Sequence, residues 1–307
     1  MISLLLMKQI GQLFLCMFMG FAIVKSKVLK SEESKPMSAV ALYLVVPCMI
    51  ITSFQIDYTE SIRDGLLLAF AAAVLIHALL LLLVPLIGRL LHLDAVEQAS
   101  IIYSNAGNLI IPLVTSVLGP EWVIYTSAFL SVQLVLLWTH GRMMLCGQKH
   151  FDIKKIVTNV NLISVLIGAF LFFSGLRLPE VLEGTMKSVG SMVGPLCMIV
   201  TGMLLGDVSL KQIFAYRRIY LVTALKMLIG PAIVLGAIKL SHLSSLHPDG
   251  ETILLISFLA VITPCASTIT QMAQIYDRDA KYAGVIGVVT TVICIVTMPF
   301  MVMLYQI

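Results

Sequence analysis

The sequence predicts an all-α polytopic membrane protein with ten transmembrane helices, built as two inverted five-helix repeats. Of its 307 residues, 59% are hydrophobic and 12% are charged, a composition typical of membrane proteins rather than of water-soluble domains. Apolar stretches of about 20 residues recur along the chain, separated by short charged connections. Polar and helix-breaking residues interrupt two of these stretches, one in each half of the chain.

Each apolar stretch is long enough to cross the hydrocarbon core of a bilayer, roughly 30 Å thick, as one helix. The first stretch is interpreted as a retained helix, because it lacks a clear small-residue cleavage site and begins a series of similar stretches. The predicted spans cover residues 5–24, 37–56, 65–87, 98–118, 122–146, 156–174, 188–206, 219–240, 252–274 and 282–304.

The two halves of the chain, residues 1–148 and 149–307, each contain five spans. Because five is an odd number, the second half must enter the membrane in the opposite orientation to the first, which makes an inverted-topology repeat. Fourteen of the 20 Lys and Arg residues lie in odd-numbered connections and four in even-numbered ones. The positive-inside rule therefore predicts cytoplasmic odd connections and two extracytoplasmic termini, in a cell inner membrane.

Spans 4 and 9 are predicted to be broken and to cross near mid-membrane. Pro112 and Pro264 each remove a helical hydrogen bond and clash with the carbonyl four residues earlier. Hydrocarbon cannot hydrate the freed groups, so irregular backbone must be buried in protein or line a wet cavity. Two interrupted spans in matching halves indicate a transport site at mid-bilayer. The alternative is a pair of ordinary proline kinks, patched by Ser or Thr side chains.

Polar donors gather beside both prolines. Asn105 and Asn108 share one face if the segment is helical, and Gly107 between them allows close approach of backbone or ligand. Span 9 contributes hydroxyl and amide groups of its own. These polar groups either contact a ligand or, as the alternative, only form hydrogen bonds between helices. The predicted substrate-binding residues are Asn105, Gly107, Asn108, Pro112, Lys226, Thr263, Pro264, Ser267, Thr268 and Gln271.

Intramembrane charge favours an anion as the ligand. All 16 Asp and Glu residues fall in connections or at span ends, which argues against a carboxylate-based cation exchanger. Lys226 lies inside span 8, where its charge adds to the positive N-terminal ends of the broken helices. It can instead snorkel to an interface or bond to freed carbonyls. His77 in span 3 is interpreted as a helix-packing histidine or as a proton-coupling group.

Other classes of function find no support in the sequence. The six cysteines lie in or beside apolar stretches without a CxxC pair, so neither disulfides nor a metal site is expected. No HExxH, GxSxG or Walker A motif occurs, and no enzyme, cofactor or nucleic-acid partner is predicted.

Residues 105–113, Asn-Ala-Gly-Asn-Leu-Ile-Ile-Pro-Leu, resemble a motif of the auxin efflux carrier family, with Ile110 where glycine is commoner. A lysine before a proline in span 8, Lys226 and Pro231, fits the same family. The resemblance implies a fold like those of bile-acid transporters and sodium–proton antiporters. It further implies that spans 4 and 9 cross at their prolines in a mobile transport domain, and that spans 1, 2, 6 and 7 form a scaffold and a homodimer interface. Asn105 would help bind a substrate carboxylate.

The predicted function is secondary-active or potential-driven transport of a small organic anion by alternating access. The resemblance points to malate, malonate or an auxin-like acid. Export of an anion would be assisted by a membrane potential that is negative inside, whereas import would need coupling to protons or sodium. The expected partners are this anion and the lipid bilayer. The alternative is a transporter-like membrane sensor or receptor, which binds a solute without moving it.

Overall fold

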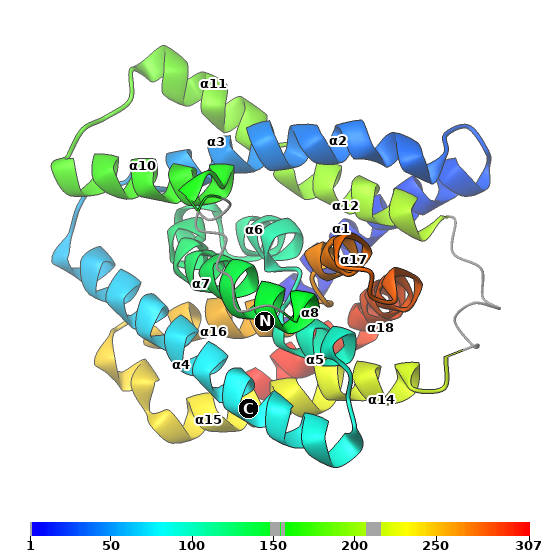
Figure 1. Ribbon diagram of the computed structural model, residues 1–307. Helices are drawn as coiled ribbons and strands as arrows, with labels where there is room; N and C mark the ends of the chain where they lie inside the picture. Colours follow the sequence, from blue (N-terminus) through cyan, green and yellow to red (C-terminus); the bar gives the residue numbers. More distant parts are fainter. Residues whose placement is uncertain (1, 148–153, 155–156, 207–215) are drawn as a thin grey trace. The chain divides into compact units, whose positions relative to one another are not determined.

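The computed structural model describes residues 2–147, 154, 157–206 and 216–307, and within these ranges the fold is all-helical (Figure 1). The helices are α1 (Ile2–Lys25), η1 (Ser31–Glu33), α2 (Ser34–Val40), η2 (Ala41–Val45), α3 (Val46–Ser53), α4 (Glu60–Leu91), α5 (Ala95–Ile102), α6 (Ala106–Val117), η3 (Pro120–Trp122), α7 (Val123–Leu136), η4 (Leu137–Gly141), α8 (Arg142–Cys146), α10 (Val160–Ser174), α11 (Glu180–Gly190), α12 (Val193–Leu205), α14 (Ile219–Ala224), η5 (Leu225–Ile229), α15 (Gly230–Ser241), η6 (Leu243–Leu246), α16 (Gly250–Val261), α17 (Ser267–Ile275) and α18 (Ala280–Gln306).

Six helical runs among the described residues are long and apolar enough to cross a membrane. They are Ser31–Ser53, Glu60–Leu91, Pro120–Cys146, Glu180–Met203, Ile219–Ser241 and Ala280–Gln306. Three shorter apolar helices accompany them, at Gly11–Lys25, Val160–Ser174 and Gly250–Val261. The all-helical class predicted from the sequence is confirmed, while the total of ten spans stays a prediction.

The chain divides into two compact units, each assembled from both halves of the sequence. Unit 1 comprises Met1–Leu66, Gly107–Ser127 and Val157–Val208, and so holds helices from the predicted spans 1, 2, 6 and 7 together with α6. Unit 2 comprises Leu67–Ala106, Ala128–Ile156 and Ser209–Ile307. The resemblance placed all of span 4 in one mobile domain, whereas α6 groups with unit 1 from Gly107 onward.

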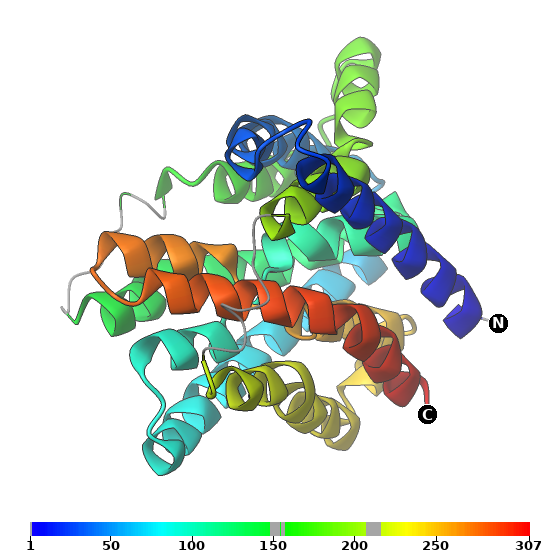
Figure 2. The ribbon, with the colours of Figure 1, turned by 90° about the vertical axis from the view of Figure 1, so that its right-hand side faces the viewer.

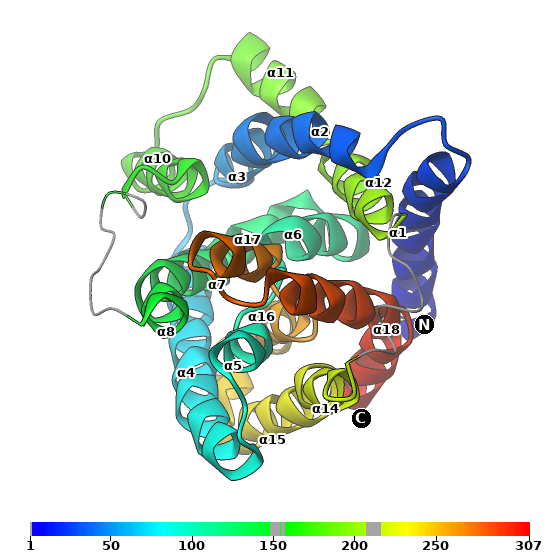
Figure 3. The same cartoon turned by 45° about the vertical axis from the view of Figure 1, so that its right-hand side comes forward.

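Unit 1 is organised around the close packing of α1 against α12, which lie side by side (Figure 3). Glycines make this approach feasible: a methyl group at Gly20 would overlap the carbonyl of Ile199, and one at Gly202 would overlap that of Met17. Small residues allow this in membrane proteins because dispersion contacts, rather than water exclusion, hold transmembrane helices together. The α1–α12 pair therefore depends on residues that lack a side chain.

In unit 2 the long helix α18 packs against α5, α14 and α17, and Figure 2 shows it running beside α17. Glu97, in the first turn of α5, is 1% exposed and accepts hydrogen bonds from Arg218 at 2.7 Å and from the Tyr282 hydroxyl at 2.9 Å. Arg218 also donates to the carbonyls of Leu91 and His92. This network joins the connection between α4 and α5 to the start of α14 and α18.

Both interrupted stretches break the helix, but Pro112 is not at the break. The first interruption covers residues 103–105, and Pro112 lies inside α6, seven positions into that helix. The second covers residues 262–266 and does contain Pro264. A proline within the first turns of a helix removes one hydrogen bond without ending it when neighbouring groups compensate. The expectation of a crossing at both prolines was therefore wrong for Pro112.

Candidate functional site

The two interruptions meet backbone to backbone inside unit 2. The N–H of Asn105 donates to the carbonyl of Pro264 at 2.7 Å, and the N–H of Ala266 donates to the carbonyl of Tyr103 at 3.0 Å. Together they form an isolated antiparallel bridge between Ser104 and Cys265. Buried N–H and C=O groups need hydrogen-bond partners. Each broken stretch provides one N–H donor and one carbonyl acceptor to the other.

The carbonyls at the end of α16 are satisfied one by one. Ala260 loses its helical donor because Pro264 has no N–H, and the hydroxyl of Thr263 donates to it at 2.8 Å. The carbonyl of Val261 accepts from the Ser104 hydroxyl at 3.3 Å. The carbonyl of Ile262 faces the thiol of Cys294 at 3.7 Å. Thr263 therefore behaves as in the alternative interpretation, a proline kink in which a Ser or Thr hydroxyl bonds to the freed carbonyl.

Lys226 satisfies the corresponding carbonyl at the end of α5. In an unbroken helix the carbonyl of Ile101 would accept from Asn105, whose N–H instead bonds to Pro264. The Nζ of Lys226 donates to Ile101 at 3.3 Å and to the Ser104 hydroxyl at 2.6 Å. Through Ser104, which donates onward to Val261, this lysine also reaches the end of α16. Its side chain is 2% exposed, so it does not snorkel to an interface.

Lys226 sits in the π-helical turn η5, which ends two residues before Pro231. A proline ring excludes a regular helical bond to the carbonyl four residues earlier, and a π turn is one way to relieve that conflict. Such turns often occur at functional sites.

The place where residues 103–105 meet residues 262–266 is called the crossing below. Its net charge is the sum of the partial charges of four helix ends and the charge of Lys226. The C-terminal ends of α5 and α16 each carry about half a negative charge, and the N-terminal ends of α6 and α17 each about half a positive one. These partial charges cancel, so Lys226 leaves about one positive charge at the crossing. No described acidic side chain donates to or accepts from these crossing residues.

Two residues that shape the crossing were missed in the sequence. The amide of Gln133 on α7 accepts from the N–H of Ser104 at 3.1 Å and donates to its carbonyl at 2.9 Å. The hydroxyl of Thr290 on α18 accepts from the N–H of Cys265 at 3.3 Å. A glutamine in an apolar span was a usable signal for the first. Nothing in the sequence distinguishes Thr290 from other span threonines.

The structure brings together part of the predicted site. Asn105 is half-buried, and its side-chain amide has no hydrogen-bond partner among the described residues. Ser267 and Thr268 open the first turn of α17, directly after the crossing, and both are partly exposed. Pro112 belongs to unit 1. Only the helical backbone is described at Gly107, Asn108 and Gln271, so these three stay predictions.

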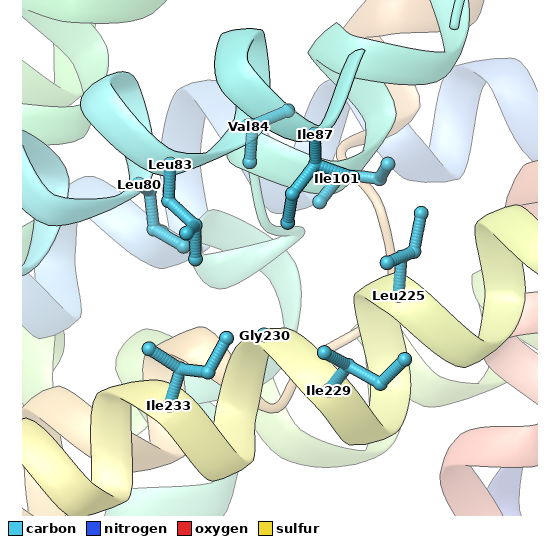
Figure 4. A pocket seen from close by; sticks show the side chains of 9 residues that line it. All are labelled: Leu80, Leu83, Val84, Ile87, Ile101, Leu225, Ile229, Gly230 and Ile233. Atoms are coloured by element: carbon cyan, nitrogen blue, oxygen red, sulfur yellow. The ribbon is translucent and has the colours of Figure 1, made fainter. Parts of the chain in front are cut away.

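An apolar hollow lies beside this site in unit 2 (Figure 4). Side chains of α4 face those of η5 and α15 across it, with Ile101 at one side. Its lining is Leu80, Leu83, Val84, Ile87, Ile101, Leu225, Ile229, Gly230 and Ile233. Because these side chains carry no donor, the hollow does not suit an anion. Within the described ranges, no three His, Cys, Asp or Glu residues are grouped to hold a metal ion.

The sequence was compared with known families and proteins. The sequence model of a family described as "membrane transport protein" matches residues 5–154 and, in a second match, residues 145–302. No curated protein matches the chain. The two matches together cover nearly the whole chain, and each covers about one half of it.

Proposed function

Because this chain belongs to the membrane transport protein family, the family of the auxin efflux carriers, we propose that it moves a small organic anion by alternating access. Membership makes it a multi-pass membrane transporter and confirms the family predicted from residues 105–113. The proposal of an anion depends on one observation above all. Lys226 donates to the carbonyl of Ile101 at the end of α5 and to the hydroxyl of Ser104, which itself donates to the carbonyl of Val261 at the end of α16. Its ammonium group therefore gives the crossing a net positive charge.

In this proposal the anion is a carboxylate such as malate, malonate or an auxin-like acid. The Asn105 amide would donate to it, since that group is partly exposed and has no partner among the described residues. The hydroxyls of Ser267 and Thr268 and the free N–H groups of the first turn of α17 would complete the cradle. Asn108 and Gln271 would add amides. Lys226 would act through its field, because its ammonium is already bonded to protein groups.

We further propose ten spans arranged as two inverted repeats, residues 1–148 and 149–307, with the crossing at mid-membrane. The two family matches, one to each half, support the repeats. Unit 1 would be the scaffold and the interface of a homodimer, because it contains the helices of spans 1, 2, 6 and 7. Unit 2 would move. Both termini would lie outside a cell inner membrane, as the cationic connections predict.

The membrane potential sets the direction in which transport is easy. A potential that is negative inside assists export of an anion by roughly 2.3 kcal/mol per charge per 100 mV. Uptake of the same anion must overcome this cost through a coupled cation. Export therefore needs no partner ion, whereas import does.

The test is flux of radiolabelled malate, malonate and indole-acetate in proteoliposomes containing the full chain. Wild-type protein should exchange at least one of these acids, and Asn105→Ala should reduce that exchange at least tenfold. Thr185→Ala, an exposed residue of α11, is the matched control and should leave exchange unchanged. Absence of wild-type flux, together with ligand-induced thermal stabilisation, would instead identify a sensor that binds without transporting.

A further inference from the structure

His77 is a second buried basic group in unit 2, and the proposed anion site does not use it. It lies on α4 and is 1% exposed. Ionisable side chains inside a membrane span are costly to bury, and they mark ion or proton pathways when the interior holds them. A histidine at this position therefore needs an explanation in terms of its two ring nitrogens.

The hydrogen bond of Nδ1 decides which nitrogen of His77 carries the proton. Nδ1 lies 2.7 Å from the carbonyl oxygen of Ala73, one helical turn earlier. A carbonyl can only accept, so Nδ1 must donate, and in the neutral ring Nε2 then presents an unprotonated lone pair. Nε2 is buried, and no side chain or backbone group of the described residues bonds to it. His77 therefore holds a basic nitrogen ready to take a proton.

Two other elements contribute the groups that surround His77. On one side α7 contributes the neutral ring of Phe129, whose centroid lies 4.7 Å from that of His77. From η5, Lys226 contributes the charge that acts on His77. A protonated His77 would carry a charge of the same sign as Lys226, and like charges repel each other more strongly away from water. A bound carboxylate near Lys226 would remove that repulsion.

We propose that Nε2 of His77 binds the proton that accompanies the anion, so that anion and proton are carried together. This inference rests on the proposed function and names its coupling ion. An N–H bond forms at Nε2 when the site faces one side of the membrane, and it breaks when the site faces the other. No further reactant is needed. Proton and anion each improve the binding of the other, because linkage between two sites is reciprocal.

Coupling would give the carrier a means of import. A monovalent anion that moves with one proton transfers no net charge, so the membrane potential no longer opposes its entry. A pH gradient that is acidic outside would then drive accumulation. A histidine that only packs against Phe129 predicts no such link between the pH gradient and the substrate.

The experiment uses proteoliposomes with the membrane potential held at zero by potassium and valinomycin. Wild-type protein should accumulate the transported acid when the outside is made acidic, and trapped pyranine should report proton entry in step with it. His77→Asn keeps an amide donor for Ala73 but has no basic nitrogen. It should still exchange labelled for unlabelled acid at equal pH, while losing accumulation and substrate-dependent proton entry. His92→Asn is the control, because His92 is exposed and asparagine tolerates its positive φ of 53°.

The outcomes distinguish the proton-coupling role of His77 from the proposed transport of an anion. Undiminished pH-driven accumulation in His77→Asn would overturn the coupling role and leave anion transport intact. Exchange in the wild type that ignores the pH gradient would do the same. Absence of any wild-type flux would overturn the proposed function itself, and the coupling with it.

A measurement on the wild type alone guards against a variant that fails to fold. Titration calorimetry of the acid into detergent-purified protein, in two buffers of different ionisation enthalpy, reports the protons taken up on binding. We expect a proton to bind with each anion. Binding heats that are equal in both buffers would contradict the proposal without any mutant.

Discussion

The Nζ of Lys226 lies 2.6 Å from the hydroxyl oxygen of Ser104, and this contact joins a lysine of η5 to the place where residues 103–105 meet residues 262–266. Ser104 accepts from Lys226 and donates to Val261, while Lys226 also donates to Ile101. One ammonium group thus serves the C-terminal ends of two broken helices, where negative partial charge collects. The same group would supply the positive field of the proposed anion site.

Lys226→Met should lower the thermal midpoint of the protein and abolish exchange of the transported acid. Methionine keeps most of the apolar stem but leaves two buried acceptors without a donor, at about 1–3 kcal/mol for each. The midpoint can be measured by following tryptophan fluorescence in detergent. Lys35→Met, an exposed residue of α2, should change neither quantity. Full exchange activity in Lys226→Met would show that the field of Lys226 is not required.

Gln133→Met should weaken the crossing from a different helix. The substitution preserves volume but leaves both the N–H and the carbonyl of Ser104 unpaired, so a loss of about 1–3 kcal/mol per group is expected. We expect a lower thermal midpoint and slower exchange. Gln98→Met removes a hydrogen bond to Leu93 far along α5 from the crossing, and it should leave exchange unchanged. Similar exchange rates in both variants would argue that Gln133 has no role at the site.

Gly202→Ala should destabilise unit 1 severely. The new methyl group would overlap the backbone carbonyl of Met17, so α1 and α12 must move apart at a cost of about 1–3 kcal/mol or more. Gly184→Ala is the matched control on α11, where a methyl group meets open space, and it should be neutral or slightly stabilising. Thermal midpoints of the two variants provide the comparison. Equal midpoints would contradict the close packing of α1 and α12.

The stability of unit 2 should fall in acid because of Glu97, which precedes the predicted span 98–118. Burial alone would raise the pKa of its carboxyl, but hydrogen bonds from Arg218, the Asp94 N–H and Tyr282 outweigh burial and hold the pKa below the ordinary 4.5. A lowered pKa in the folded state contributes stability above about 4.5, which is lost as the pH falls through the folded-state value.

The thermal midpoint of Glu97→Gln should therefore lie below that of the wild type at neutral pH, and the gap should close in acid. Glu180→Gln, at an exposed position on α11, serves as the control and should follow the wild type throughout. A gap that stays constant down to the lowest pH would mean that the carboxylate charge contributes nothing.

Part of the site was predictable because the rule involved is local. A proline in an apolar stretch frees a carbonyl wherever it occurs, and Pro264 does lie in a break whose freed carbonyl is bonded by Thr263. The same rule failed for Pro112, which α6 accommodates. Whether a freed group ends a helix depends on which neighbours can bond to it, and neighbours such as Gln133 come from distant parts of the chain. The hydrogen-bond partners of Lys226 could not be predicted from the sequence for the same reason.

Composition and the spacing of apolar stretches determined by themselves that this protein is helical and enters the membrane, because hydrocarbon admits only backbone whose polar groups are satisfied internally. The motif at residues 105–113 predicted its family, and the family matches over both halves confirmed that prediction. Only the tertiary structure decided that the break falls at residues 103–105, that Ser104 meets Cys265, and that Lys226 serves two helix ends. Those features are hydrogen bonds between groups as far apart in the chain as Tyr103 and Ala266, and no local pattern specifies which distant donor will meet a given acceptor.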